Sequence, residues 1–578
     1  MKKTYALFFL LSMCCAGVLP AQITPTNDHI LYVNKAVSGG NGNGSSWANA
    51  IPELADALKW ARAQYDANNN WLAGDSLRIY IAEGTYKPLY DADNGRYQND
   101  GGRDNAFVII NRVHLYGGFP STGNPGMGQR NWKTHITTLS GDIGIPNDPS
   151  DNVYHVLISM GSGNVHLDGL KITGGNANAT HQTPGVRIPG NDITYIRNTG
   201  AGSLLSGNHS LRLSNMEISG NTAAYAGAGY IFGAPVFFNI TVRNNVATER
   251  GGGLFFTDPR VNPIVLNALF TGNTAKNGAA IYNRADSLIL VNTTIADNVA
   301  TLAGSGVFSD VSDPGMGDPF RNPVLINSIL WNQQPGAISM IQNAGGIPMK
   351  VTHSIVQGAA PPSGTGNSNA NPLFTNAGSG NYTLMNGSPA INTGSNQLWN
   401  ASNIGETALD LAGAARLVGN AIDMGAFESQ TALPVSFGSF RATLKNEQLV
   451  FHWSTETETN NDHFLVQVSA DGANWKTVQT VQSKAMAGNS HAALEYAVAI
   501  PLATLGLSAG FLLLGVVASN CRRRALAVAA FLVCFLIFAC RKNDRIESAE
   551  TGTLYARLVQ VDKDGTERVS KIIQVVQE

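Results

Sequence analysis

Cysteine is almost missing from the body of this chain. Of the five cysteines in 578 residues, two lie at positions 14 and 15 and three at positions 521, 534 and 540. The stretch from residue 23 to residue 520 has none, so disulfide bonds cannot hold it together. We therefore expect this stretch to depend on a large hydrophobic core.

Charged residues are scarce as well, at 13% of the chain, and the formal net charge is only -2. No basic run occurs outside residues 520–545, which excludes the charge pattern of a nucleic-acid-binding protein. The sequence also lacks His-rich or Cys-rich metal-binding spacings and any Ser/His/Asp or Cys/His arrangement with supporting context. We expect no nucleic-acid partner and find no ready-made catalytic motif.

The chain does have a sequence motif that is repeated four times between residues 213 and 309. The copies are LSNMEISGNTAAYAGAGYIF, FNITVRNNVATERGGGLFF, LNALFTGNTAKNGAAIYN and VNTTIADNVATLAGSGVFS. They align a first Asn at positions 215, 239, 267 and 292, a second Asn at 221, 245, 273 and 298, and a Gly at 227, 251, 278 and 304. A period of about 25 residues is typical of one coil of a solenoid, whose coils stack because none can bury its own apolar face.

The residues within each copy predict strands. Apolar side chains alternate after the first Asn, as in Met216 and Ile218, and period two indicates a half-buried strand. We expect a turn with a left-handed backbone at the second Asn, followed by a glycine-opened second strand. Two or three short strands per coil predict an all-β right-handed parallel β-helix, and helical repeats are excluded because they need a 3.6-residue period and far less glycine.

The repeat extends in both directions. Upstream, VHLDGLKITGGNAN aligns with it if Asp168 takes the first Asn position, and downstream VTHSIVQG places His353 in that column. A helix near residues 51–63 is predicted to cap the N-terminal end. The excursions at 179–206 and 310–322 are expected to be loops leaving single coils, where solenoids often carry their function.

These segments also resemble known proteins. The series YVNKAVSGGNGNGSSWANA, IYIAEGTYKP, VHLYGGFP, LSGDIG, NVYHVLIS and LDGLKITGGNA is similar to the parallel β-helix proteins of Bacteroidetes-type bacteria, and the four repeats resemble those of polymorphic outer-membrane proteins. NPLFTNAGSGNYTLMNGSPAINTGSN and ALDLAGAARLVGNAIDMGAFE resemble the closing segment of the choice-of-anchor Q group. The resemblance implies a pectate-lyase-like β-helix over residues 23–430 in a cell-surface setting, and it implies no particular activity.

The two ends of the chain predict export and a second domain. Residues 1–22 have the Lys-containing start, the apolar run and the small residue of a secretory signal peptide. Residues 433–496 and 552–578 carry short alternating strands and resemble a fibronectin-III-like β-sandwich.

A hydrophobic stretch at 497–540 interrupts this sandwich. It has two runs, 497–519 and 525–540, which predict a transmembrane helical hairpin that tethers the protein to a membrane. Two alternatives stay open: a core hairpin buried in protein, or a second, lipoprotein-like signal with Cys540 as the lipid acceptor.

Candidate ligand-binding residues are few. The loop SDVSDPGMGDPFRNP gathers Asp310, Asp313, Asp318 and Arg321, which either bind calcium or a sugar or form a solvated turn. A second cluster contains Glu249, Arg250, Asp258 and Arg260, and Tyr225, Tyr282 and Trp331 are candidates for stacking on sugars. The asparagine columns are expected to be structural ladders, because a lyase of this fold would need acidic side chains there.

We therefore expect an exported, membrane-anchored surface protein that acts as an adhesin or a glycan-binding scaffold. We assign no catalytic residue, no metal ligand and no cofactor, with calcium at the Asp310 loop as the alternative. The enzymatic alternative is a polysaccharide lyase or hydrolase of pectate-lyase-like fold, in which carboxylates from adjacent coils converge with a Lys or Arg. A third alternative is a structural envelope spacer without a ligand.

Overall fold

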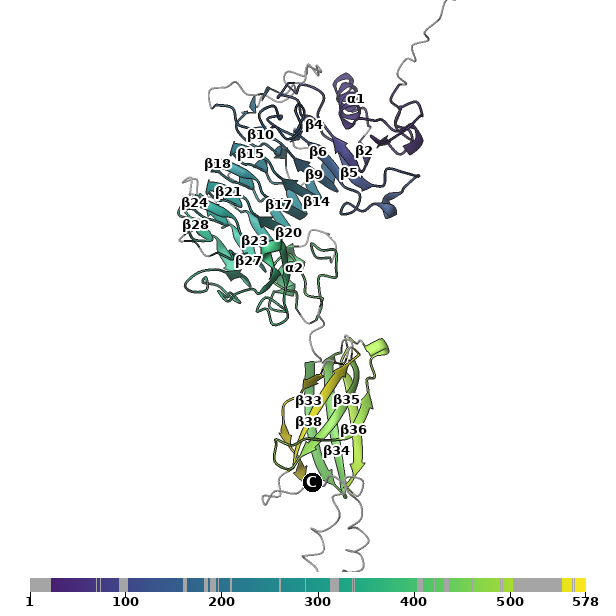
Figure 1. Cartoon of the computed structure of the whole chain (residues 1–578), viewed down its shortest axis with the longest axis vertical. Helices are drawn as coiled ribbons and strands as arrows, with labels where there is room; N and C mark the ends of the chain where they lie inside the picture. The colour runs from purple at the N-terminus through teal and green to yellow at the C-terminus, as the bar shows by residue number, and fades with distance from the viewer. Residues whose placement is uncertain are drawn as a thin grey trace, which may run out of the picture. The chain divides into compact units, whose positions relative to one another are not determined.

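The computed structural model describes residues 22–502 and 554–577, with gaps at 69, 73, 93–101, 160–163, 181–185, 188–193, 196, 208–209, 259–260, 286, 312–321, 335, 337, 403–408, 420, 431–435, 459–460, 489, 491, 564 and 566. The predicted signal peptide and most of the hydrophobic stretch lie outside these residues. The chain divides into two compact units between Ser429 and Gln430, and each is mostly β-structure (Figure 1).

The first unit is a parallel β-helix made of three sheets. In the repeat region each coil contributes one strand to each sheet, and neighbouring coils pair in parallel. The four repeat coils are β14 (Leu211–Ser219), β15 (Thr222–Tyr225) and β16 (Gly229–Gly233); β17 (Val236–Arg243), β18 (Val246–Arg250) and β19 (Leu254–Phe256); β20 (Ile264–Thr271), β21 (Thr274–Asn277) and β22 (Ile281–Asn283); and β23 (Ile289–Ala296), β24 (Val299–Ala303) and β25 (Val307–Ser309).

The long sheet has 15 strands among the described residues, and it runs through every coil. Its other strands are β1 (Ile30–Val33), β2 (Leu77–Ala82), β3 (Gly84–Tyr86), β5 (Val113–Phe119), β6 (Thr137–Ser140), β8 (Val165–Asp168), β9 (Leu170–Thr173), β26 (Val324–Ile326), β27 (Ile329–Trp331), β29 (Lys350–Thr352) and β30 (Ile355–Val356). Besides the repeat strands, the five-stranded parallel sheet contains β10 (Asn176–Ala177). The eight-stranded parallel sheet contains in addition β4 (Phe107–Ile109), β7 (Leu157–Ser159), β13 (Ser203–Gly207) and β28 (Ile341–Asn343). A separate antiparallel pair is formed by β11 (Val186–Arg187) and β12 (Thr194–Tyr195).

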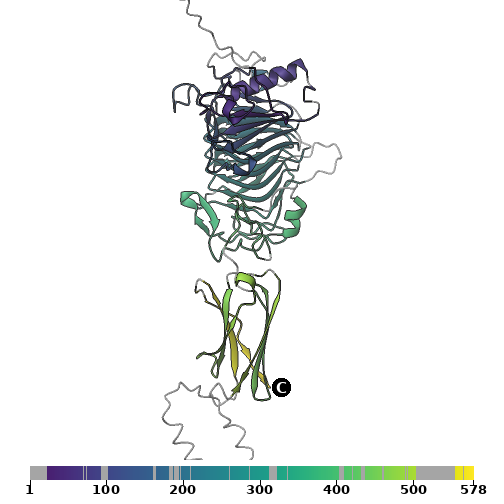
Figure 2. The same cartoon turned by 90° about the vertical axis from the view of Figure 1, so that its right-hand side faces the viewer.

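Like residues superpose inside the bore because the coils pair in register. One fully buried column of the long sheet passes through successive strands at Leu213, Phe237, Val265, Leu290 and Leu325. Helix α1 (Leu54–Ala67) crosses the N-terminal end of the coils and buries Leu54, Ala57, Leu58 and Ala61 against this core (Figure 2). It begins three residues later than expected, since the chain before Pro52 still pairs through Ile51 with Val33.

The first Asn column makes the bend in the long sheet. Asn215, Asn239, Asn267, Asn292 and Asn327 all have φ between 47° and 57°, and His353 follows them at 45°. Asn tolerates this left-handed backbone better than most residues with a side chain. The placement of Asp168 in this column is wrong by one residue, because Asp168 pairs with Ser214 and Gly169 takes the left-handed position at 73°.

The second Asn column is a continuous buried ladder. The side-chain amides of Asn221, Asn245 and Asn273 each donate to the carbonyl oxygen of the next Asn, at 2.9, 3.0 and 2.9 Å, ending at Asn298. The same oxygens also accept the backbone N–H of the preceding Asn. The left-handed turn expected at these residues is instead made by the residues before them, Gly220, Asn244, Gly272 and Asp297.

After the last coil, residues 371–429 turn back along the outside of the long sheet. We call this segment the closure; it contains β31 (Phe374–Asn376), β32 (Asn381–Leu384) and α2 (Asn396–Ser402). Its Trp399 and Ile422 pack on outward-facing Phe238, Leu266 and Val291. In Figure 2 the closure lies beside the C-terminal coils, in green. The outward-facing residues of these coils are apolar because the closure packs over them.

The second unit is a β-sandwich. One sheet has the order β37-β34-β33-β41, and the other has β36-β35-β38-β39 with β40 on β38. Trp453 stacks on Tyr496 with ring centres 5.0 Å apart and meets Phe464 of the facing sheet at 5.6 Å. The strands are β33 (Ser436–Lys445), β34 (Gln448–Thr457), β35 (Asn461–Ser469), β36 (Lys476–Gln482), β37 (Leu494–Pro501), β38 (Tyr555–Asp562), β39 (Glu567–Val569), β40 (Ile573–Gln574) and β41 (Val576–Gln577).

The start predicted for the first membrane span is wrong. Residues 497–501 belong to β37, which pairs antiparallel with β34, and Ile500 is buried in the sandwich core. Because this strand has no charge after Glu495, its hydropathy alone cannot distinguish it from the start of an apolar helix. Among the described residues no helix is both long and apolar enough to span a bilayer. The rest of the predicted hairpin, 503–540, lies outside them.

Candidate functional site

The outward face of the long sheet changes character halfway along the stack. One outward position per coil runs through Tyr32, Tyr80, Tyr116, Asp168 and Ser214, in register. The same position in the following coils is apolar and is covered by the closure. The polar and aromatic side chains of the first coils therefore mark the part of this face that the closure does not cover.

Three tyrosines form what we call the tyrosine row: Tyr32, Tyr80 and Tyr116. Neighbouring rings meet edge to face, with centres 5.8 and 5.9 Å apart. Trp47 and Phe119 pack against the row from one side, which fixes the rings in place. The rings are half-buried, and their hydroxyls form no hydrogen bond with another described residue. The row thus presents ordered aromatic rings whose hydroxyls are not engaged by other described residues.

A second outward position gives the Arg–His row: Arg78, His114, His166 and Arg212. Arg78 pairs in register with His114, and His166 with Arg212, while the two imidazole rings lie 6.4 Å apart. Burial is the main cause that lowers the pKa of both histidines to about 4, and nearby positive charge lowers it further. At neutral pH both imidazoles are therefore neutral.

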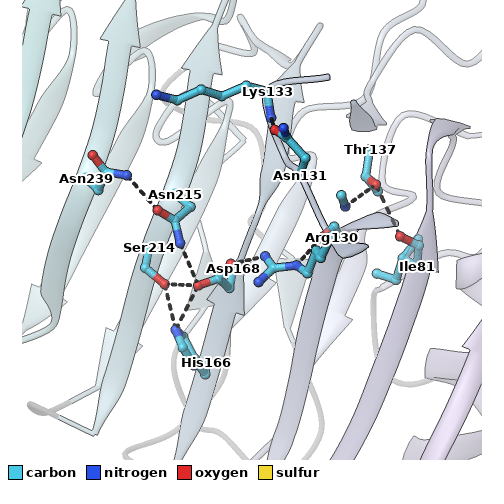
Figure 3. Close-up of polar contacts among 12 residues, drawn as sticks. Ile81, Arg130, Asn131, Lys133, Thr137, His166, Asp168, Ser214, Asn215 and Asn239 are labelled. Atoms are coloured by element: carbon cyan, nitrogen blue, oxygen red, sulfur yellow. Dashed lines mark hydrogen bonds and ion pairs between the residues drawn. The ribbon is translucent and has the colours of Figure 1, made fainter. Parts of the chain in front are cut away.

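Asp168 lies at the centre of a polar network where the two rows meet (Figure 3). Arg130 forms an ion pair with one carboxylate oxygen, and the other accepts from the Ser214 hydroxyl and, at 3.0 Å, from the Asn215 amide. His166 Nε2 lies 2.7 Å from the Ser214 hydroxyl and 3.5 Å from Asp168. Burial lowers the pKa of Arg130 to about 10, which leaves it charged at neutral pH.

This network is not a nucleophilic triad. In a triad the carboxylate holds the histidine and the histidine takes the serine proton, whereas here the Ser214 hydroxyl donates directly to Asp168. The hydroxyl oxygen is then left to accept from the His166 Nε2–H, so His166 does not activate it. The network instead attaches the loop that carries Arg130 to the sheet.

The loop after β5 also reaches the closure. The Lys133 ammonium donates to the carbonyls of Leu411 at 2.9 Å and Ala412 at 2.5 Å, and burial lowers the pKa of Lys133. Asn267 of the first Asn column donates to the Leu409 carbonyl nearby. These contacts close the C-terminal boundary of the open face.

The predicted Asp310 loop is described only at its first residues. Asp310 accepts a hydrogen bond from the Tyr282 hydroxyl at 2.8 Å, and burial together with this bond raises the pKa of Tyr282 to about 12. Asp313, Asp318 and Arg321 lie outside the described residues. The prediction of a ligand site in this loop remains a prediction.

Of the second predicted cluster, Arg250 lies 5.3 Å from the Tyr282 ring centre, and Glu249 pairs with Lys276 at 2.6 Å. Tyr282 is 2% exposed, which removes it as a sugar-stacking residue. Trp331 packs at the edge of the apolar cluster under the closure. Asp258 has a partner, and Arg260 lies outside the described residues.

The described residues contain no group of three or more His, Cys, Asp or Glu side chains arranged to hold a metal ion. The asparagine columns are bonded along the stack, as expected of ladders. The outward tyrosines and histidines were not identified from the sequence, although a signal existed. Aligning RIYIA, VHLYGG and VHLDG by their inward residues places Arg78, His114 and His166 in one column and Tyr80 and Tyr116 in the next.

Comparison with known proteins gives few matches. No family model matches the chain. A stretch of 107 residues is 34% identical to metabotropic glutamate receptor-like protein R of Dictyostelium discoideum, covering 17% of this chain but 6% of that protein. Among solved structures, the chain is similar to pectate lyase Pel9A with a TM-score of 0.33 and 14% identity, over 71% of this chain and 98% of that one.

Proposed function

We propose that this is an exported, membrane-tethered surface protein that binds glycans on the outward face of its first coils. Export is supported by residues 1–22, and tethering by the apolar composition of residues 503–540, whose charges are confined to Arg522, Arg523 and Arg524. The second unit, for which we propose a fibronectin-III-like relationship, carries this apolar stretch between its strands β37 and β38.

The tyrosine row is the observation that carries glycan binding. Each ring has an apolar surface and a hydroxyl, which together suit the C–H faces and the hydroxyls of a sugar. Because Trp47 and Phe119 already hold the rings, little conformational entropy is lost when a ligand binds. Successive rings are spaced by one coil, so a linear glycan can contact several of them in sequence.

Binding is favoured over cleavage because the carboxylates on this face are already paired. A calcium-dependent lyase site needs acidic side chains from neighbouring coils, and a hydrolase needs a pair of carboxyl groups. Here Asp168 pairs with Arg130, and Ser214 replaces a carboxylate on the next coil. Glu217, another carboxylate on β14, is likewise paired, with Arg243 at 2.8 Å and Lys171 at 3.2 Å.

The test is a glycan array probed with the full-length protein, its Tyr80→Ala/Tyr116→Ala double variant and a Tyr225→Ala control on another sheet. We expect the wild type and the control to bind at least one linear glycan, and the double variant to lose at least tenfold in affinity. No binding by the wild type would support a spacer. Release of unsaturated or reducing ends from the glycan would support an enzyme.

A further inference from the structure

The side chains on the same face indicate which chemical class of glycan binds there, and this inference rests on the proposed function. We propose that the ligand is an acidic glycan whose carboxylate or sulfate groups bind along the Arg–His row while its sugar rings contact the tyrosine row. The two rows run side by side at successive outward positions of the same strands. A chain lying along the stack thus meets both rows at once.

Positive charge surrounds the two histidines. Arg78 acts on His114, and Arg212 and Arg130 act on His166, each lowering the pKa of the imidazole beside it. Burial is the largest cause of both shifts, and the arginines add to it because they place positive charge beside the imidazoles. The same positive charge attracts an anion placed there. The row therefore offers two guanidinium groups at its ends and two imidazoles between them.

Two carboxylates, Asp75 and Asp168, lie near the row, and Arg212 has an interaction of its own within the protein. Asp75 lies 3.7 Å from Arg78, which also donates to the Asp28 carbonyl at 3.3 Å. The Arg78 and Asp75 side chains are 39% and 51% exposed, and such a partly exposed ion pair is weak enough for a ligand anion to displace. Asp168 lies closer to His166, yet both of its oxygens are used by Arg130, Ser214 and Asn215. His166 keeps more than a quarter of its side chain exposed, so a ligand can reach it.

Anion binding would also couple to protonation of the histidines. An anion beside His114 and His166 favours their charged forms and raises their pKa values from about 4. Affinity for an acidic glycan is therefore expected to rise as the pH falls from 7 toward 5, and a neutral glycan should show no such trend. Asp75 raises the pKa of His114 in the same direction as the ligand would, and Asp168 lies 3.5 Å from His166, while burial is the main cause of the low values without ligand.

The deciding experiment compares matched ligands on the full-length wild-type protein. The probes are polygalacturonate oligosaccharides, the same oligosaccharides after carboxyl reduction, and a sulfated dextran oligosaccharide with its unsulfated parent. We expect each acidic member to bind at least tenfold more tightly than its neutral partner, with a difference that shrinks as salt is added. Tighter binding of only one acidic pair identifies carboxylate or sulfate as the group recognised.

An Arg78→Gln/Arg212→Gln double variant then locates the site, with Arg441→Gln on the sandwich as the matched control. We expect the double variant to lose the preference for acidic ligands while keeping its thermal unfolding midpoint and its affinity for neutral ones. Equal binding of acidic and neutral partners by the wild type, or an unchanged preference in the variant, overturns this inference but leaves glycan binding standing. Absence of binding to every glycan overturns the proposed function itself.

Discussion

Asparagine has two separate uses in this protein, and both follow from its side chain. In the first column it accepts a left-handed backbone, with φ near 55° at Asn215, Asn239 and Asn267. In the second column it has an ordinary backbone and uses its amide as both donor and acceptor toward the neighbouring coils. The repeat therefore needs the same residue twice for different physical reasons.

The ladder predicts that an internal member is costly to remove. Asn273→Ala takes the shared acceptor from the backbone N–H and the side chain of Asn245, and takes a donor from the carbonyl of Val242. Because all of these groups are buried, we expect a loss of about 2–4 kcal/mol in the free energy of unfolding. Urea unfolding measures this loss, and Asn400→Ala on the exposed face of α2 should cost almost nothing; equal costs would contradict the ladder.

The left-handed column predicts an order of stability between two substitutions. Asn239→Gly and Asn239→Ala both lose the amide that donates to Asn215 at 2.6 Å. Glycine adopts the φ of 57° without strain, whereas alanine does not, so the alanine variant should be less stable by about 1 kcal/mol. Thermal unfolding of the two variants measures this difference, and a more stable alanine variant would show that this backbone is not left-handed.

At the scale of elements, the closure joins residues far apart in sequence through buried charge. Asp410, Asp423 and Glu428 each accept backbone N–H bonds from within the closure, and the fully buried Arg416 lies among them. We call these four residues the buried charge cluster. The Asn292 amide links this cluster to the coils by donating to the carbonyls of Asp423 and Gly425. The buried charge cluster therefore holds the closure in place over the apolar half of the long sheet.

The buried charge cluster predicts that the stability of the protein depends on pH. Burial first, and then Asp423, raise the pKa of Glu428 from 4.5 to about 8. Between these values the folded closure binds a proton that the unfolded chain does not, so the free energy of unfolding falls as the pH rises through this window. Burial raises the pKa of Asp423 to about 6, which adds a loss of the same sign between 3.8 and 6.

Glu428→Gln should remove most of the loss above pH 6. We expect the variant to unfold at a higher temperature than the wild type at pH 8–9 and to lose that advantage at pH 5. Glu495→Gln, an exposed site on β37, serves as the control and should leave the profile unchanged. An advantage of the same size at every pH would show that Glu428 is ionised throughout.

Strand β37 gives the second prediction at this scale. Ile500 pairs with Leu449 and is 5% exposed in the sandwich core, whereas Ala499 beside it is exposed. Ile500→Asp should lower the unfolding free energy of the second unit by about 3 kcal/mol or more, and Ala499→Asp should have little effect. Urea unfolding of the full-length protein measures both; equal effects would argue against an alternating strand.

For the whole molecule, the repeats predict most of the fold and little of the site. Stacked coils of short parallel strands follow from the spacing of the asparagines and glycines, because a coil this short can bury its apolar face only against its neighbours. The sequence pattern places the left-handed turn one residue too late, because the preceding residues Gly220, Asn244, Gly272 and Asp297 are also types that tolerate this backbone. Asp168 is likewise misaligned by one residue, because Gly169 takes the left-handed position. Errors of one residue matter in strands because they reverse the face.

The open face could not be predicted because its residues come from coils with little sequence similarity. Tyr32, Tyr80 and Tyr116 are separated by 36–48 residues, and irregular insertions hide their common position. The part that the closure leaves uncovered depends on how residues 371–429 fold back, which no local pattern encodes. Only the register between strands brings the rows together.

Hydroxyl-radical footprinting of the full-length protein with and without a saturating glycan ligand tests the central claim, that the first coils bind through their outward face. Tyr32, Tyr80, Tyr116 and His114 should be protected from modification by the ligand, while Tyr225 and Tyr230 on the other sheets should react as before. Protection at Tyr225 or Tyr230, with the tyrosine row unchanged, would place the binding surface elsewhere and contradict the account.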